Sequence, residues 1–211
     1  MSSDLISFRN VCTKNNSGNY ILSHVNFILH KNEFLSIYGS AGSGKTTIYK
    51  VIAGYVEFAG EYKLYDKPIS WYSEENINSI NGKIGLMPSS LSFEESLTVL
   101  QNMKIISSND SISPEEALEI CNGSNLLKRN FMFLNGVERI KVYLAGLLMG
   151  NPELLILDEP SGELDDDRSK EIYDILERIY KRGVTILVLS RKQKFLSYST
   201  KIMYLNKGRL T

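Results

Sequence analysis

Residues 39–47 read Gly39-Ser40-Ala41-Gly42-Ser43-Gly44-Lys45-Thr46-Thr47, between an apolar run at 34–38 and a helical pattern at 46–53. This spacing matches the phosphate-binding loop G-x-x-x-x-G-K-[ST], in the order strand, glycine turn, helix that the pattern requires. The glycines let main-chain N–H groups converge on phosphate oxygens, and the helix N-terminus adds a favourable dipole. The Lys45 ammonium reaches the β- and γ-phosphates, and the Thr46 hydroxyl is placed to bind Mg²⁺.

A plainer alternative for this stretch is a glycine turn before an amphipathic helix. Every fixed position of the pattern is filled, however, and both flanks are correct. We therefore predict a nucleoside triphosphate site.

The composition limits the class of protein. The chain has 211 residues, 43% hydrophobic and 23% charged, which fits one sizeable globular domain. Lysine plus arginine equal aspartate plus glutamate, 24 each, so no net positive field directs the chain to nucleic acid. Cys12 and Cys121 give no disulfide framework or metal cluster, which fits a reducing cytoplasm. Without a signal peptide pattern or a run of 18 apolar residues, the chain is not expected to cross a membrane by itself.

The apolar pattern predicts an α/β fold with an antiparallel start. Predicted strands lie at residues 5–11, 20–22, 25–29, 34–38, 61–65, 68–70, 83–87, 154–157, 184–189 and 202–205. Lys31-Asn32 has the composition of a hairpin turn. The pattern is helical from about 90 to 150, with Ser113 as a cap and Pro114 at the first helical position, and again at 172–179. We expect a helical lobe inserted in a P-loop sheet.

An acidic pair, Asp158-Glu159, follows the apolar run at 154–157. Ligands of open α/β sheets bind beyond the carboxyl ends of the strands, which is where this pair is expected. Asp158 would hold Mg²⁺ directly or through water, and Glu159 would polarise the attacking water as general base. The alternative makes the two residues the acidic first turn of the next helix.

The chain resembles an ABC ATPase in three further segments. Leu134-Asn135-Gly136-Val137-Glu138 resembles the signature, and residues 151–165 resemble the Walker B and D-loop, which ends at Asp165. Residues 97–102 resemble the segment after the Q-loop. The Ser-Gly-x-Leu-Asp form at 161–165 is similar to the subgroup serving lipoprotein release, macrolide efflux and cell division. The similarity extends over essentially the whole chain, so residues 1–211 are expected to form a single ATP-binding domain.

The resemblance implies an assembly. In this family two ATP-binding domains stack head to tail, and each nucleotide lies between one domain's P-loop and the other's signature. Membrane-spanning partners, a permease or a membrane regulator, contact the helical lobe near the Q-loop. The resemblance thus implies ATP and Mg²⁺ as cofactors and a cytoplasmic position on the inner face of the membrane. Whether the dimer is homotypic or heterotypic stays open.

Four positions depart from the family pattern. The signature serine is Asn135, which together with Glu138 completes a capping-box-like arrangement. Its second glycine is Val137, a β-branched residue expected to resist positive φ and to add bulk near a γ-phosphate. The Q-loop glutamine aligns with Ser89, which has a shorter reach. The switch histidine aligns with Arg191, which cannot shuttle a proton near neutral pH but can hold a γ-phosphate.

The position of the adenine-stacking aromatic is also changed. Asn15 falls there, and Tyr20 is a candidate substitute that has a core or edge role as its alternative. His24 and His30 lie in the N-terminal strands and cannot replace the switch histidine.

We therefore expect an ATP-binding subunit of a membrane complex with slow or partner-dependent hydrolysis. The alternative is a non-transport regulator that signals by nucleotide occupancy. A soluble P-loop kinase is a distant third.

Overall fold

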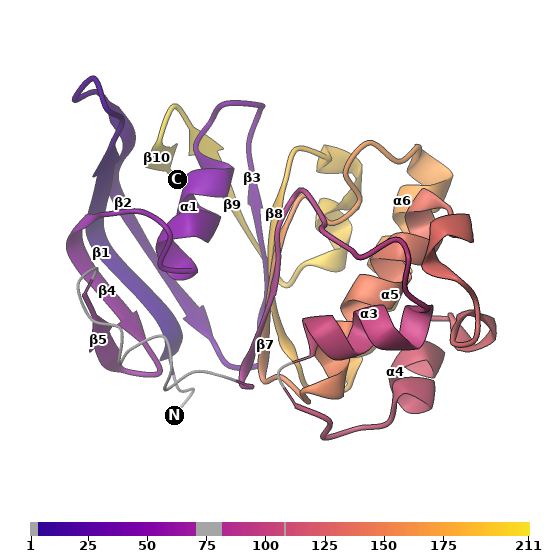
Figure 1. The fold of residues 1–211 in the computed structure, drawn as a ribbon. Helices are drawn as coiled ribbons and strands as arrows, with labels where there is room; N and C mark the ends of the chain where they lie inside the picture. Colours follow the sequence, from indigo (N-terminus) through magenta and orange to yellow (C-terminus); the bar gives the residue numbers. More distant parts are fainter. Residues whose placement is uncertain (1–3, 71–81, 108) are drawn as a thin grey trace. The chain divides into compact units, whose positions relative to one another are not determined.

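The computed structural model describes residues 4–70, 82–107 and 109–211 (Figure 1). The chain divides into two compact units. The sheet unit comprises Met1–Ile80, Ile156–Asp158 and Thr185–Thr211, and the helical unit comprises Asn81–Leu155 and Glu159–Val184. Each unit is described by itself below.

An antiparallel sheet opens the sheet unit, in the strand order β2-β1-β4-β5. Its strands are β1 (Asp4–Lys14), β2 (Tyr20–His30), β4 (Ala59–Leu64) and β5 (Lys67–Ile69). The pairing of β1 with β2 shifts register between Phe8 and Val11, where Asn10 adopts a φ of 52°. β2 is one continuous strand through His24, which also has a positive φ, so the two runs predicted at 20–22 and 25–29 belong together.

A parallel sheet forms the other part of the sheet unit, in the order β10-β9-β3-β8-β7. β3 (Phe34–Tyr38) pairs in parallel with both β8 (Thr185–Ser190) and β9 (Lys201–Asn206). The order starts at β10 (Arg209–Leu210), which is antiparallel to β9, and β7 (Leu154–Asp158) follows β8. Parallel strands buried on both faces explain the continuous apolar runs.

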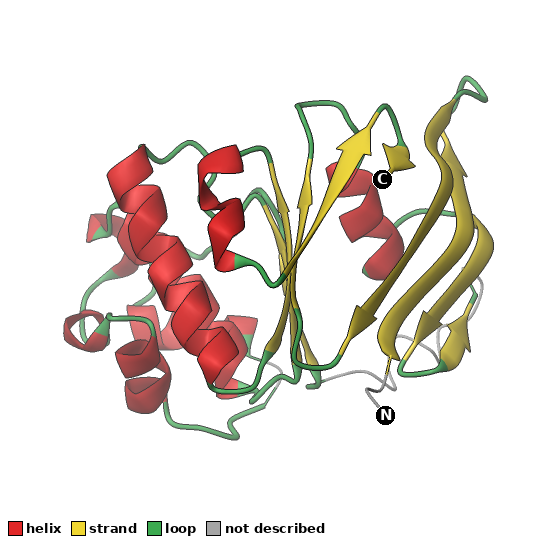
Figure 2. Ribbon diagram, turned by 180° about the vertical axis from the view of Figure 1, so that it is seen from behind, coloured by secondary structure: helices red, strands yellow, loops and turns green. Residues whose placement is uncertain are grey.

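The predicted hairpin at Lys31-Asn32 is wrong. β2 pairs with β1, and β3 joins the parallel sheet, so these two residues connect two different sheets. The helix α1 (Lys45–Ile52) begins directly after the loop that leaves β3. It lies between β3 and the antiparallel sheet in both ribbon views (Figures 1 and 2). Its buried residues include Ile48, Val51 and Ile52, so it fills the core of the sheet unit.

The helical unit contains the strand β6 (Ile84–Met87) and four α-helices among its described residues. They are α3 (Val99–Ile106), α4 (Pro114–Ile120), α5 (Gly136–Met149) and α6 (Asp166–Lys181). Short 3-10 turns lie at Ser124–Leu126 and Phe131–Phe133 in this unit, and at Gln193–Tyr198 in the sheet unit. The helix α5 is the centre of the helical unit because it packs against α3, α4 and α6.

Local sequence signals set the helix starts. Ser113 accepts a hydrogen bond from Glu116 N, and Pro114 occupies the first turn of α4, as predicted. Thr98 and Gln101 form a complete capping box at α3. The predicted fold class, an α/β P-loop sheet with N-terminal antiparallel strands and a helical lobe, is confirmed.

Candidate nucleotide-binding site

The loop of residues 39–47 has a backbone that requires glycine. Gly42 and Gly44 have φ values of 75° and 111°, in the left-handed region. A Cβ on Gly39 would lie 2.5 Å from Leu205 O, and one on Gly44 would lie 2.9 Å from the Leu22 Cδ2. The loop is thus held tightly by neighbouring strands of the sheet unit, as a phosphate cradle of main-chain amides requires.

The Lys45 side chain is 6% exposed and lies inside this loop. Its Nζ donates to Gly39 O at 2.7 Å and to Ser40 O at 3.0 Å. α1 begins at Lys45 with Gly44 as N-cap and without a side-chain cap, so its first turn presents main-chain donors to an anion. Thr46 is exposed at this end of the helix, and Thr47 N donates to Gly44 O.

A buried hydroxyl supports a phosphate ligand at this loop. Ser43 is 4% exposed, and its Oγ has no hydrogen-bond partner although a buried hydroxyl normally has one. The tight glycine backbone, the Lys45 ammonium and this hydroxyl together fit a polyphosphate. The residues predicted to bind nucleotide, from Gly39 to Thr47, lie in this loop and the first turn of α1, within the sheet unit.

The carboxyl edge of the parallel sheet carries Asp158. This residue ends β7 and is completely buried. In the strand order β7 lies next to β8, which lies next to β3, so Asp158 and the loop share one sheet edge. Glu159 follows with a φ of 50°, a left-handed conformation that costs about 1–3 kcal/mol in a residue other than glycine. Backbone of this kind is concentrated at functional sites, which is consistent with the role predicted for Glu159.

No group of three or more His, Cys, Asp or Glu side chains that could hold a metal ion occurs among the described residues. Mg²⁺ keeps several waters and binds through one or two carboxylates plus phosphate oxygens. Thr46 and Asp158 are the residues predicted to hold it.

β8 also ends at this edge. Its last residue, Ser190, lies opposite Tyr38 in the β3–β8 register, and Ser190 O accepts a hydrogen bond from Gly39 N at 3.1 Å. Ser190 Oγ accepts from Lys192 N at 3.1 Å, which forms the turn after the strand. Arg191 stands between these residues and is exposed. Arg191 therefore directly follows Ser190, the residue whose carbonyl oxygen accepts the hydrogen bond from Gly39 N.

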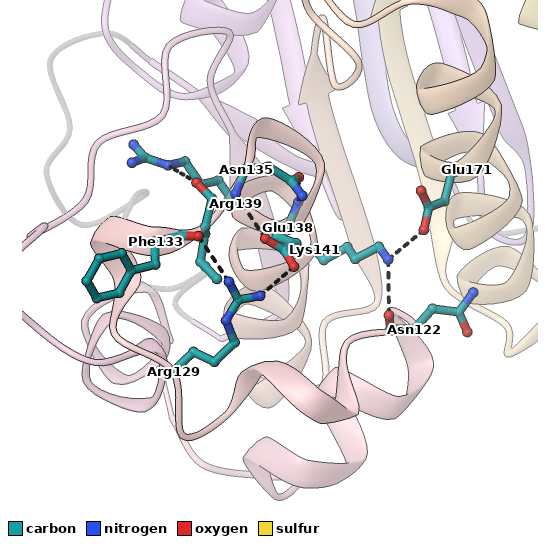
Figure 3. A network of polar contacts seen from close by, with 9 residues as sticks. Asn122, Arg129, Phe133, Asn135, Glu138, Arg139, Lys141 and Glu171 are labelled. Atoms are coloured by element: carbon teal, nitrogen blue, oxygen red, sulfur yellow. Dashed lines mark hydrogen bonds and ion pairs between the residues drawn. The ribbon is translucent and has the colours of Figure 1, made fainter.

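In the helical unit, the predicted signature residues form the start of α5 (Figure 3). Glu138 N donates to Asn135 Oδ1 at 3.0 Å, and Asn135 N donates to Glu138 Oε2 at 2.9 Å. The predicted capping box is therefore confirmed. Arg129 clamps this box: its Nη1 donates to Glu138 Oε1 at 2.6 Å and its Nη2 to Phe133 O at 3.0 Å.

The strain expected at Val137 is wrong. Val137 is the second residue of α5 and does not have a positive φ. Its side chain is 7% exposed, so its bulk packs inside the helical unit. Gly136 N and Val137 N donate to no protein acceptor in the described structure. The start of α5 therefore keeps two main-chain donors despite both substitutions.

Two other predicted residues of the helical unit have local roles. Ser89 is exposed in the loop that follows β6. Asp165 is the N-cap of α6, where its Oδ1 accepts from Arg168 N at 2.9 Å. Neither observation tests a role in nucleotide turnover.

Asn15 and Tyr20 both line a cavity of about 800 Å³ on the antiparallel sheet, and none of residues 39–47 lines it. Asn15 Oδ1 accepts from Ser17 N and Asn19 N, so its side chain builds the turn between β1 and β2. Tyr20 is 57% exposed, and Lys14 Nζ lies 4.8 Å from its ring centroid. The base-stacking role of Tyr20 remains a prediction.

Sequence reasoning missed Arg129, because no motif links it to a glutamate nine residues later. It also missed Lys141 of α5, which is 9% exposed and contacts α6 and the turn that follows α4. Lys141 Nζ lies 2.5 Å from Glu171 Oε1 and donates to Asn122 O at 3.1 Å (Figure 3). A lysine in a helical pattern is normally exposed to solvent. Only the packing of α4, α5 and α6 shows that Lys141 is buried and makes structural contacts.

Comparison with known proteins places these features in a family. The sequence matches the ABC transporter family over residues 22–162. It is 30% identical over 215 residues to the spermidine/putrescine import ATP-binding protein PotA of Desulfitobacterium hafniense, covering 100% of this chain and 62% of PotA. It is 28% identical over 203 residues to the cell division ATP-binding protein FtsE of Bacillus subtilis, covering 92% of this chain and 88% of FtsE.

Solved structures share the fold. The dimeric ABC transporter cassette MJ0796 superposes with a TM-score of 0.85 at 24% identity, covering 97% of this chain and 96% of that one. cbiO1 of Clostridium perfringens, part of the transporter complex cbiONQ, superposes with a TM-score of 0.87 at 23% identity, covering 99% and 87%. Among the described residues of this chain, none of the helices has the length and apolar character needed to span a membrane.

Proposed function

Because this chain belongs to the ABC transporter family, we propose that it binds MgATP at residues 39–47 and acts as the ATP-binding subunit of a membrane complex. The observation that carries the proposal is the loop itself. Its glycine-dependent backbone surrounds a buried lysine and an unpartnered buried hydroxyl, Ser43 Oγ, at the start of a helix. Such a site is chemically complementary to a polyphosphate.

The chain's own residues then have distinct roles. Lys45 binds the β- and γ-phosphates as a point charge, and the main-chain donors at the start of α1 bind the phosphate oxygens. Thr46 and Asp158 hold Mg²⁺, which neutralises developing charge on the phosphates when bound. Glu159 accepts a proton from the attacking water.

We propose an assembly of two ATP-binding domains with a membrane-spanning partner. MJ0796 is dimeric and cbiO1 is part of a multi-component transporter complex, which supports this assembly. Through that partner the chain is placed on the inner face of the membrane. The two donors at Gly136 and Val137 are available to the nucleotide of the second domain, whether that domain is a copy of this chain or a different one.

Hydrolysis is proposed to be slow or dependent on the partner. Ser89 is too short to replace a glutamine that reaches the nucleotide, and Arg191 cannot exchange a proton near neutral pH. An alternative function is regulation by nucleotide occupancy with little turnover. The similarity to FtsE and the Ser-Gly-x-Leu-Asp form at 161–165 support the subgroup that includes the cell-division complex, whereas PotA is named for polyamine import.

Calorimetry and turnover of the purified protein test this proposal. We expect MgATP binding that Lys45→Ala removes, and a low rate of phosphate release that Glu159→Gln removes without loss of binding. Rapid hydrolysis by the isolated chain would contradict slow turnover. Absence of ATP binding by a folded protein would contradict the function.

Affinity purification from the native host with a non-hydrolysable nucleotide then identifies the membrane partner. Recovery of the chain without any membrane protein would favour the regulatory alternative.

A further inference from the structure

The inference concerns the distribution of charge between the two units. The whole chain has no net charge, with 24 lysine and arginine and 24 aspartate and glutamate residues. The sheet unit, however, contains 13 of the cationic and 8 of the acidic residues, and the helical unit contains 11 and 16. Their net charges are therefore +5 and −5. A chain with one basic and one acidic unit is complementary in charge to a second copy of itself placed head to tail.

The excess positive charge of the sheet unit comes from its last segment. Residues 191–211 contain six lysine and arginine residues and no aspartate or glutamate. The turn between β9 and β10 contacts the phosphate loop directly, because Gly208 N donates to Ser43 O at 2.9 Å. Lys207 and Arg209 stand on either side of Gly208, and both are exposed. These two cations form a basic border of the phosphate loop.

Part of the negative charge of the helical unit lies beside the start of α5. Four of the five residues at 163–167 are aspartate or glutamate, and all four are exposed. Gly136, the first residue of α5, lies against this acidic segment, since a Cβ on it would be 3.5 Å from Leu164 Cδ2. The two main-chain donors of α5 therefore have an acidic border within the helical unit.

The arginines near the start of α5 do not make this surface basic, because each of them is paired with a carboxylate. The ion pairs are Arg129–Glu138 at 2.6 Å (Figure 3), Arg139–Glu95 at 3.0 Å and Arg168–Asp165 at 3.5 Å. A paired arginine and carboxylate have no net charge together. The other carboxylates of the acidic segment therefore keep this part of the helical unit negative.

We propose that the second ATP-binding domain is another copy of this chain, with the basic border of one copy against the acidic segment of the other. This inference rests on the proposed function, in which the phosphate loop of one domain faces the start of α5 in the other. A two-fold pairing forms the contact twice, so the charges of both copies are matched at once. Each copy then completes the nucleotide site of the other with the donors of Gly136 and Val137.

Charge reversal with complementary rescue tests the proposal. Lys207→Glu/Arg209→Glu makes the border of the loop acidic, and Glu163→Lys/Asp167→Lys makes the segment beside α5 basic. With a non-hydrolysable Mg-nucleotide, we expect sedimentation velocity to show dimers of the unmodified chain. Each variant alone should lose at least about 100-fold in dimer affinity, since like charges then meet at both contacts. An equimolar mixture of the two variants should recover most of this affinity, because each contact again joins opposite charges.

Lys63→Glu/Lys67→Glu is the matched control, since it changes the net charge of the sheet unit by the same amount. These lysines lie on β4 and β5, whereas the β9–β10 turn contacts β2 through the hydrogen bond from Ser23 N to Gly208 O. The control should weaken the dimer by less than about 10-fold, as for charges outside a contact. Raising the salt concentration from about 0.1 M to about 1 M should weaken the unmodified dimer, because the Debye length falls from about 10 Å to about 3 Å.

Circular dichroism and calorimetry with MgATP establish first that each variant is folded and binds nucleotide. Single reversals, Arg209→Glu and Asp167→Lys, form the same complementary pair if a double variant does not fold. An unmodified chain that binds MgATP and stays monomeric would overturn the inference, leave the proposed function intact and indicate a different chain as the second domain. A mixture that does not associate, or an equal loss in the control, would also overturn it. If the folded, unmodified chain binds no MgATP, the proposed function fails as well.

Discussion

Arg129→Met tests whether the clamp on Glu138 stabilises the first turn of α5. The Arg129 guanidinium donates to Glu138 Oε1 at 2.6 Å and to Phe133 O at 3.0 Å. Hydrogen bonds to charged groups contribute about 1.5–3 kcal/mol each, and solvent screening reduces this value at partly exposed pairs. The two side chains are 38% and 20% exposed. We therefore expect Arg129→Met to lower the free energy of unfolding by about 1–2 kcal/mol.

A double-mutant cycle separates the ion pair from the contact with Phe133 O. Glu138→Gln keeps an oxygen for Asn135 N but removes the charge that Arg129 faces. Urea denaturation followed by circular dichroism should give a coupling of about 1 kcal/mol between the two substitutions. The matched control is Arg168→Met, whose ion pair with Asp165 spans 3.5 Å and is 66% and 59% exposed, so its loss should cost less than about 0.5 kcal/mol. Additive effects of Arg129→Met and Glu138→Gln, or an equal loss in the control, would refute the reasoning.

Three shorter predictions concern buried groups. Thr13→Val should raise the free energy of unfolding by about 1 kcal/mol, because Thr13 Oγ1 is buried without a hydrogen-bond partner. Thermal melts measure the change, and a loss of stability would contradict it. Burial raises the pKa of the Cys121 thiol to about 12, so that thiol stays protonated at pH 8. A disulfide reagent should then label the half-buried Cys12 and reach Cys121 only after denaturation, and labelling of both in the folded protein would disprove it. Gly146→Ala should lower the free energy of unfolding by about 1–3 kcal/mol, because the added Cβ would lie 2.9 Å from Ile106 Cβ. Helix propensity alone predicts the opposite, a gain of about 1 kcal/mol. Urea denaturation distinguishes the two, and a more stable variant would contradict the packing argument.

The fold was predictable where one local pattern carries the information. Continuous apolar runs predicted the buried strands β3, β7 and β8, since both faces of a parallel sheet are covered by elements packed against it. The helix caps Ser113 and Asn135 were also predictable, because capping depends on a side chain and a group three residues later in the sequence. The partner of each strand was not predictable in the same way.

The error at Lys31-Asn32 shows why. Two turn-forming residues between two strands indicate a change of direction, but they do not specify which sheet the second strand enters. That choice depends on β8 and β9, which come more than 140 residues later and pair with the two edges of β3. The split predicted within β2 has a local cause, since the bulge at His24 interrupts the alternation without ending the strand.

The candidate site shows the same division between pattern and packing. The loop at 39–47 was predictable from its spacing, because each fixed position of the motif has a chemical requirement of its own, and its binding of nucleotide stays a prediction. Val137 was misread, because a motif position gives the residue type and not the direction of its side chain. In the structure that side chain is buried within the helical unit, and the main-chain donors beside it remain. Slow turnover is therefore attributed to Ser89 and Arg191, and no longer to strain at Val137.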